Sequence, residues 1–154
     1  DSHDTERILT TAKGDLQSVK SALAFLYLQR GTPCIYYGTE LALIGGPDPD
    51  CRRVMPWERV SSDNDMLNFM KNLIQLRKEV AGIIQHGNVS LEEVDPDVVA
   101  VEWQYEGQFL KAYFNHSKKD FVLERGQADL ISHGSISDER LIVQPNGFVI
   151  YREN

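Results

Sequence analysis

The segment Gly31-Thr32-Pro33-Cys34-Ile35-Tyr36-Tyr37-Gly38-Thr39-Glu40 decides the fold class of the first half of the sequence. Its centre, residues 34–38, is a short apolar run without polar alternation, which is typical of a strand buried on both faces of a parallel sheet. Pro33 blocks the continuation of a helix into this run. A parallel strand needs a neighbouring strand on each side. We therefore predict that residues 1–82 are a slice of a larger α/β layer.

Apolar residues at helical spacing lie on both sides of the predicted strand. The first helix is predicted from Leu16, Val19, Leu23, Leu26 and Tyr27, with Asp15 placed to cap its start and Gly31 to end it. The second helix is predicted from Met66, Phe69, Met70, Leu73, Leu76 and Val80, with Asp63 or Asp65 near its start and Gly82 just beyond it. The order helix, strand, helix indicates an α/β fold.

The second half of the sequence changes to the spacing of β-strands. Apolar residues alternate along residues 99–105, Glu106-Gly107 makes a turn, and further strands are predicted at residues 109–114 and 121–124. Near the end, apolar runs at 141–143 and 148–151 flank Pro145-Asn146-Gly147, and Asn-Gly between apolar runs predicts a β-hairpin. We place a domain boundary near Gly82 and expect residues 83–154 to form a small antiparallel β domain.

The composition argues against several classes of partner. The 154 residues are 42% hydrophobic and carry a formal net charge of -7, which fits a globular protein and argues against nucleic-acid binding, because that needs a basic face. No run reaches the roughly 20 apolar residues of a membrane span, so we expect no membrane partner. The polar first residues show no signal peptide, and we expect a cytoplasmic rather than a secreted protein.

The only two cysteines are Cys34 and Cys51, too few for a disulfide scaffold. We expect two free thiols, and a single disulfide between them is the alternative. No histidine lies near either cysteine at the spacing of a zinc site, so we predict no metal site.

Four segments, in this order, resemble the C-terminal part of the α-amylase superfamily, glycoside hydrolase family 13. They are Ser2-His3-Asp4-Thr5-Glu6-Arg7, the segment 31–40 quoted above, residues 45–53 with Met55-Pro56-Trp57, and the helix that then leads into a β domain. The details look most like the neopullulanase, cyclomaltodextrinase and maltogenic amylase branch. The resemblance implies the last part of a (β/α)8 barrel (the end of strand 7, helix 7, strand 8 and helix 8), followed by a small antiparallel β-sandwich domain.

The resemblance also implies the roles of four residues. Asp4 matches the family's third carboxylate, a catalytic group that hydrogen-bonds sugar hydroxyls at the reacting ring, and His3 matches the histidine that contacts the same ring. Asp48 and Arg52 resemble the pair that holds the next sugar toward the non-reducing end. The alternatives are structural: a turn or helix-cap role for Asp4, and a salt bridge that stiffens the loop for Asp48 and Arg52.

The residues around these four receive structural interpretations. Trp57 is a candidate stacking platform for a sugar, and Glu40 is expected to be structural. A calcium site in the loop is rejected, because the run lacks the regular oxygen ligands of a calcium loop. Three pairs are also considered: Asp50 with Arg53 as the alternative loop salt bridge, Glu6 with Arg7 as an ion pair, and Tyr36 with Tyr37 as core aromatics or, alternatively, stacking platforms for a sugar.

We therefore predict a fragment of a retaining α-glucan hydrolase or transglycosylase that acts on maltodextrins, cyclodextrins or pullulan. The chain carries Asp4 but neither the nucleophile nor the general acid, so we expect it to be inactive alone. Its expected partners are an α-glucan oligosaccharide, the missing N-terminal part of the barrel and, because an incomplete barrel exposes apolar faces, further copies of itself. No cofactor is expected, and calcium in the parent protein is left open. The alternative is a non-catalytic carbohydrate-binding, regulatory or assembly module.

Overall fold

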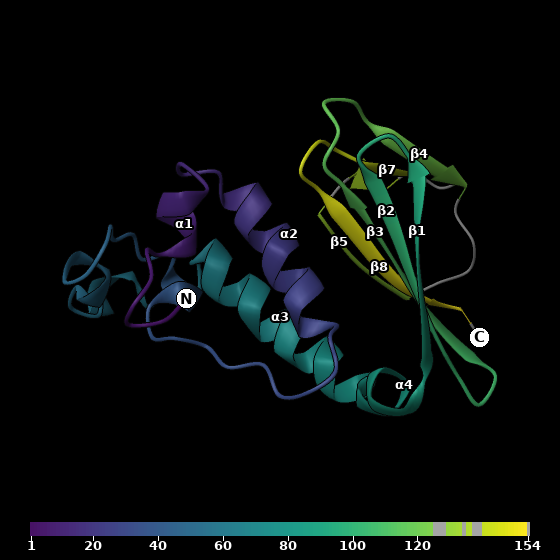
Figure 1. Ribbon diagram of the computed structural model, residues 1–154, viewed down its shortest axis with the longest axis horizontal. Coiled ribbons are helices and arrows are strands. Elements are labelled where there is room, and N and C mark those ends of the chain that lie inside the picture. The colour runs from purple at the N-terminus through teal and green to yellow at the C-terminus, as the bar shows by residue number, and fades with distance from the viewer. Residues whose placement is uncertain (125–128, 134, 137–139, 154) are drawn as a thin grey trace. The chain divides into compact units, whose positions relative to one another are not determined.

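The computed structural model describes residues 1–124, 129–133, 135–136 and 140–153 (Figure 1). The chain divides into two compact units, which are described separately. The first consists of Asp1–Tyr27 and Gly31–Leu76, and the second of Leu28–Arg30 and Arg77–Asn154.

Helices and short 3-10 turns make up the first unit, all of whose residues are described. The α-helices are α1 (Ile8–Thr11), α2 (Leu16–Tyr27) and α3 (Asp65–Glu79), the last of which runs on into the second unit. The 3-10 turns are η1 (Thr39–Leu41), η2 (Asp50–Arg52) and η3 (Trp57–Arg59).

Helix α2 begins at the predicted cap. The Asp15 carboxylate accepts hydrogen bonds from the backbone N–H of Gln17 and Ser18, at 3.0 and 3.2 Å, which satisfies two of the free donors at a helix start. The helix ends at Tyr27, so Gly31 does not terminate it directly. Leu26, which follows the helical apolar spacing, is 47% exposed.

Helix α3 begins at Asp65, in agreement with the prediction of Asp63 or Asp65 near its start. The side-chain oxygen of Asn64, just before the helix, accepts the N–H of Leu67 at 2.8 Å and caps the helix. Asp65 lies 2.6 Å from the ammonium of Lys20, a lysine buried on α2. This pairing provides the opposite charge that a buried cation requires.

The predicted strand at residues 34–38 is wrong for the isolated chain. Within the first unit, every residue of which is described, no strand forms. Cys34, Ile35 and Tyr37 are exposed rather than buried on both faces, and Gly38 already begins the η1 turn with a φ of 83°. The reason is that a parallel strand bonds only to neighbouring strands, and this part of the chain offers it none.

The second unit contains two antiparallel sheets. The five-stranded sheet has the order β1-β2-β3-β8-β5 and the three-stranded sheet the order β4-β7-β6. The strands are β1 (Asn88–Asp95), β2 (Val98–Tyr105), β3 (Gln108–Asn115), β4 (Phe121–Glu124), β5 (Asp129–His133), β6 (Ser135–Ile136), β7 (Arg140–Val143) and β8 (Phe148–Glu153).

The predicted strand at residues 99–105 and the turn after it are confirmed. Glu106 and Gly107 both have positive φ, 50° and 80°, which is the conformation of a two-residue hairpin turn, and β2 then pairs with β3. Trp103 is 2% exposed and Val101 is buried on the same face. Helix α4 (Ala81–His86) lies against β2 and β3.

Gly82 was expected just beyond the second helix. It lies inside α4, which starts almost directly after α3, so glycine does not end the helical part of the chain. None of the helices in the described residues is long and apolar enough to cross a membrane.

The predicted C-terminal hairpin is also wrong. Strand β7 belongs to the three-stranded sheet and β8 to the five-stranded sheet, so the turn between them carries the chain from one sheet to the other. Gly147 donates its N–H to Gln144 at 2.8 Å, which makes Pro145 and Asn146 the central residues of the turn. Asn146 has a φ of 59°. Proline cannot adopt the positive φ that a type I′ hairpin turn requires at its first central position.

Candidate functional site

The four predicted site residues lie in the first unit, and two of them are chain neighbours at its start. The Nε2 of His3 lies 3.2 Å from Oδ2 of Asp4, and both side chains are largely exposed, at 64% and 70%. The backbone N–H of Asp4 donates to the Ser2 hydroxyl at 3.2 Å, and that hydroxyl also lies 3.1 Å from the hydroxyl of Thr5. A local turn therefore holds Asp4 with its carboxylate open to solvent.

The other two predicted residues form a charge pair in the loop that contains η2. Arg52 Nε lies 2.7 Å from Oδ1 of Asp48, and both side chains are about half exposed. This is the geometry of a charge-assisted hydrogen bond.

The loop with η2 is attached to the segment that carries His3. The backbone carbonyl of His3 accepts hydrogen bonds from Arg52 Nε and from the Cys51 thiol, both at 3.2 Å. The structure thus brings the two predicted pairs together, His3 with Asp4 and Asp48 with Arg52. The separation between His3 and Arg52 in the sequence is 49 residues.

The Arg7 side chain holds the loop around Cys51 in place through hydrogen bonds, a role that the sequence did not reveal. It is fully buried. Its Nε donates to the carbonyl of Cys51 and its Nη1 to the carbonyl of Tyr37, both at 2.7 Å. The expected ion pair between Glu6 and Arg7 is therefore wrong, since Glu6 is exposed and Arg7 turns inward.

Asp1 and two tyrosines surround the Arg7 guanidinium. Oδ2 of Asp1 lies 3.8 Å from Arg7 Nη1 and accepts the Thr39 hydroxyl at 2.7 Å. The Arg7 Cζ lies 4.2 Å from the ring centre of Tyr36 and 4.7 Å from that of Tyr37. Neither ring is fully buried. The tyrosines thus form part of the cation's surroundings rather than of an apolar core.

Gly45 allows the loop to approach the N-terminal segment. Its carbonyl accepts the N–H of Arg7 and its own N–H donates to the Thr10 hydroxyl, both at 2.9 Å. A Cβ at this position would lie 2.6 Å from the backbone oxygen of Asp50. Only a glycine therefore fits without moving the backbone of the loop.

Asp50 and Arg53 form the alternative pair, and their contacts are structural. Arg53 donates to both oxygens of Asp50 at 2.8 Å, and the N–H of Gly46 donates to one of them at 2.7 Å. The hydrogen bonds from Arg53, and then that from Gly46, hold the pKa of Asp50 below its usual value. This pair joins residues within the loop, and its side chains are about as exposed as those of Asp48 and Arg52.

The remaining candidates from the sequence are Trp57, the two cysteines and a possible metal site. Trp57 is 71% exposed on η3. Both cysteines are free, as expected, with Cys34 exposed and Cys51 buried. Among the described residues, no group of three or more histidine, cysteine, aspartate or glutamate side chains is arranged to hold a metal ion.

The cluster suits the binding of hydroxyl groups. Carboxylates accept hydrogen bonds from hydroxyls, the guanidinium donates to them, and imidazole can do either. The exposed carboxylates of Asp4 and Asp48, with the Arg52 guanidinium beside Asp48, can form hydrogen bonds with neighbouring hydroxyls of one ring or of adjacent rings.

Comparison with known proteins gives the following matches. Residues 1–75 match the sequence model of the α-amylase catalytic domain. The chain is 34% identical, over 162 aligned positions, to the intracellular maltogenic amylase of Bacillus subtilis, covering 97% of this chain and 28% of that protein. It is 35% identical to the cyclomaltodextrinase of Thermoanaerobacter pseudethanolicus, covering 98% of this chain and 27% of that protein.

A solved structure extends the similarity to the fold. The crystal structure of a maltogenic amylase from S. marinus superposes with a TM-score of 0.78 and 28% sequence identity, over 99% of this chain and 21% of that one. The chain spans about a quarter of the length of the curated relatives it matches.

Proposed function

Because residues 1–75 match the α-amylase catalytic domain, we propose that the chain forms the C-terminal part of a retaining α-glucan hydrolase or transglycosylase. The substrates of this parent enzyme are maltodextrins, cyclodextrins or pullulan. This choice of substrates is supported by the similarity of the chain to proteins named maltogenic amylase and cyclomaltodextrinase.

In this proposal Asp4 is the carboxylate that hydrogen-bonds hydroxyls of the reacting sugar. Its exposure, and the local turn that fixes it, leave its oxygens available to a ligand. Charged hydrogen bonds to the ring strengthen as positive charge develops in the oxocarbenium-like transition state. His3, at 3.2 Å from Asp4, contacts the same ring.

Asp48 and Arg52 bind the next sugar toward the non-reducing end. The observation that carries the proposal is the pair of hydrogen bonds from Arg52 and Cys51 to the carbonyl of His3. These bonds join the loop that carries Asp48 and Arg52 to the segment that carries His3 and Asp4. In this proposal the two pairs therefore bind adjacent sugars of one chain. A salt bridge serving only to stiffen the loop would not need this connection, because Asp50 and Arg53 already provide it.

Residues 1–82 correspond in this proposal to the last part of a (β/α)8 barrel, and residues 83–154 to a β-sandwich domain. Two buried side-chain atoms support the first part: Nη2 of Arg7 and Oε2 of Glu40 have no hydrogen-bond partner among the described residues. Buried polar atoms are normally bonded. We infer that the rest of the barrel supplies their partners and pairs with residues 34–38 as a strand.

The proposed partners of the chain follow from the same argument. They are an α-glucan oligosaccharide, the remainder of the barrel and further copies of the chain. Val54 and Trp57 are strongly exposed apolar side chains in the first unit and suit contacts with either protein partner.

A chimeric enzyme tests the role of Asp4. In the Bacillus subtilis maltogenic amylase, the segment that aligns with this chain is replaced by residues 1–154, and hydrolysis of a nitrophenyl maltoside is measured. We expect an active chimera, and Asp4→Asn should lower its kcat by about 10³-fold, as the loss of a transition-state hydrogen-bonding group does. Asp63→Asn, a change at an exposed aspartate of the same unit, is the matched control and should leave kcat unchanged. An active chimera in which Asp4→Asn behaves like Asp63→Asn would refute the assignment.

The isolated chain should not hydrolyse the same substrate, because a nucleophile and a general acid must come from elsewhere. The measurement is release of nitrophenol by the purified chain, with the intact relative as positive control. Turnover by pure material would contradict this expectation. Tight binding of maltotriose in calorimetry, together with an inactive chimera, would favour the non-catalytic module instead.

A further inference from the structure

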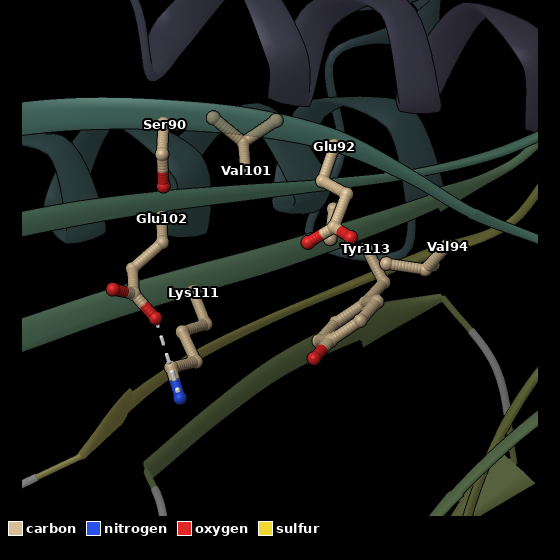
Figure 2. A pocket seen from close by; sticks show the side chains of 8 residues that line it. Ser90, Glu92, Val94, Val101, Glu102, Lys111 and Tyr113 are labelled. Carbon is tan, nitrogen blue, oxygen red and sulfur yellow. Dashed lines mark ion pairs between the residues drawn. The ribbon is translucent and has the colours of Figure 1, made fainter.

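A pocket of about 270 Å³ lies on the five-stranded sheet, over strands β1, β2 and β3 (Figure 2). It belongs entirely to the second unit. Its lining includes six residues that project from the same side of the three strands: Ser90, Glu92, Ala100, Glu102, Lys111 and Tyr113.

The strand register explains why the sheet is hollow at this place. Ser90 pairs with Glu102, which pairs with Lys111, and this gives one row of side chains across the sheet. In the adjacent row, Ala100 lies between Glu92 and Tyr113. Because Ala100 is the only small apolar residue among these six, it forms a floor between longer side chains.

The aromatic wall of the pocket is held in place by its neighbours. The ring of Tyr113 stacks on Tyr151, with ring centres 6.2 Å apart and an interplanar angle of 9°, and lies 5.9 Å from the ring of Phe121. These contacts belong to the cluster that also contains Val149 and joins the two sheets. Tyr113 is therefore fixed before a ligand arrives, which lowers the entropy cost of binding.

The pocket is lined by charged groups of both signs. The Lys111 ammonium lies 3.4 Å from a carboxylate oxygen of Glu102, and Figure 2 shows the Glu92 and Tyr113 side chains among those that line the pocket. Within the part of the chain that the structure describes, neither Glu92 nor Ser90 has a side-chain hydrogen bond. The pocket thus offers acceptors, a donor and two hydroxyls around a small apolar floor.

We propose that this pocket binds one glucosyl unit of an α-glucan chain. An uncharged ring with several hydroxyls both donates and accepts, and so matches carboxylates, ammonium and hydroxyls at once. An anion is disfavoured, because two carboxylates face one ammonium that is already paired. The choice of an α-glucan among polyhydroxylated ligands rests on the proposed function.

The test uses the labelled 154-residue chain, titrated with maltotriose and followed by NMR. Maltotriose should shift amide signals of residues 90–113 at millimolar concentrations. Glu92→Gln should weaken this binding about tenfold, since a hydrogen bond to a charged group is lost. Glu93→Gln is the matched control: Glu93 pairs with Val99 and lies on the opposite face of β1, so binding should stay within about twofold of that of the unchanged chain.

Tyr113→Phe removes only the hydroxyl and gives a second variant that keeps the ring packing. It should also weaken maltotriose binding, by about threefold for an uncharged hydrogen bond, with the signals of Tyr151 and Phe121 unchanged. Equal affinity of Glu92→Gln and Glu93→Gln would overturn the proposal. Shifts from spermidine but not from maltotriose would also overturn it, because the ligand would then be an amine.

The outcomes separate this inference from the proposed function. Maltotriose shifts confined to the segments around Asp4 and Asp48 would refute the pocket and leave the proposed function standing. Shifts at residues 90–113 combined with an active chimera that tolerates Asp4→Asn would support the pocket and refute the role of Asp4. The Asp48→Asn variant should leave the shifts at residues 90–113 unchanged.

Discussion

The two units of the chain differ in how their backbone is satisfied. In the second unit, each strand pairs with a neighbour inside the unit, and all of these pairings are antiparallel. In the first unit, residues 34–38 have the composition of a strand but find no partner strand among the residues described. In that unit, the loops near the candidate site are held by side chains that donate hydrogen bonds to backbone carbonyls, chiefly by Arg7. The comparison shows that the strands of a local hairpin satisfy each other's backbone hydrogen bonds, whereas a single strand of a parallel sheet needs partner strands from elsewhere.

The largest expected effect is on the second unit, whose stability should come from apolar packing. Trp103→Ala should lower its free energy of unfolding by about 3–5 kcal/mol, because a large buried ring is replaced by a cavity. Amide hydrogen exchange of residues 98–115 measures this loss. The matched control is Trp57→Ala, which removes an exposed ring and should change stability by no more than about 0.5 kcal/mol. Equal losses for the two variants would show that Trp103 does not anchor the unit.

The first unit should depend instead on one buried cation. Arg7→Met should destabilise it by about 3 kcal/mol, because the carbonyls of Tyr37 and Cys51 lose their donors while buried volume is roughly kept. Hydrogen exchange and limited proteolysis of residues 36–53 measure the effect. Arg59→Met, at an exposed arginine of the same unit, is the control. If residues 36–53 remained as protected in Arg7→Met as in the control, side-chain bonding to the backbone would not be what orders the site.

The smallest effect concerns pH and the Asp50–Arg53 pair. The folded-state pKa of Asp50 lies below its unfolded value of about 3.9, so the pair stabilises the loop above that pH. This contribution is lost as the pH falls through the lower folded-state pKa. Asp50→Asn should therefore increase proteolysis of the loop slightly at pH 7, and this difference should shrink as the pH falls through the lowered folded-state pKa. A Glu58→Gln control should show no such pH dependence, and a difference that does not shrink at acidic pH would contradict the assignment.

Some elements could be predicted because their causes are local. Asp15 is followed by apolar residues at helical spacing, and the α2 cap is where the sequence placed it. Glu106-Gly107 produced the expected turn, because both residues tolerate positive φ better than β-branched ones. The Asn146-Gly147 signal misled, because the preceding proline takes the first central position of the turn. Strand β1 was not predicted, and all its residues are exposed, so the apolar alternation of a half-buried strand is weak there.

In the candidate site, too, some residues could be predicted from local sequence and others could not. His3 with Asp4 and Asp48 with Arg52 were candidates from motif order, and their roles stay predictions. Arg7 was missed because nothing in Thr5-Glu6-Arg7 distinguishes an arginine that turns inward from one that pairs with its neighbour. Gly45 was missed as well, since its need for close backbone approach appears only when Asp50 lies against it.

By itself, the sequence determined the resemblance to the α-amylase family, the helix start at Asp15, the strand spacing of residues 98–115 and the identity of the candidate site residues. These depend on residue type, order and short-range geometry. Only the tertiary structure decided that the His3 carbonyl receives Arg52 and Cys51, that Arg7 lies beneath them, and that Ala100 makes a hollow between Glu92 and Tyr113. Such contacts join residues far apart in the chain or on different strands, and no local propensity encodes which of them meet.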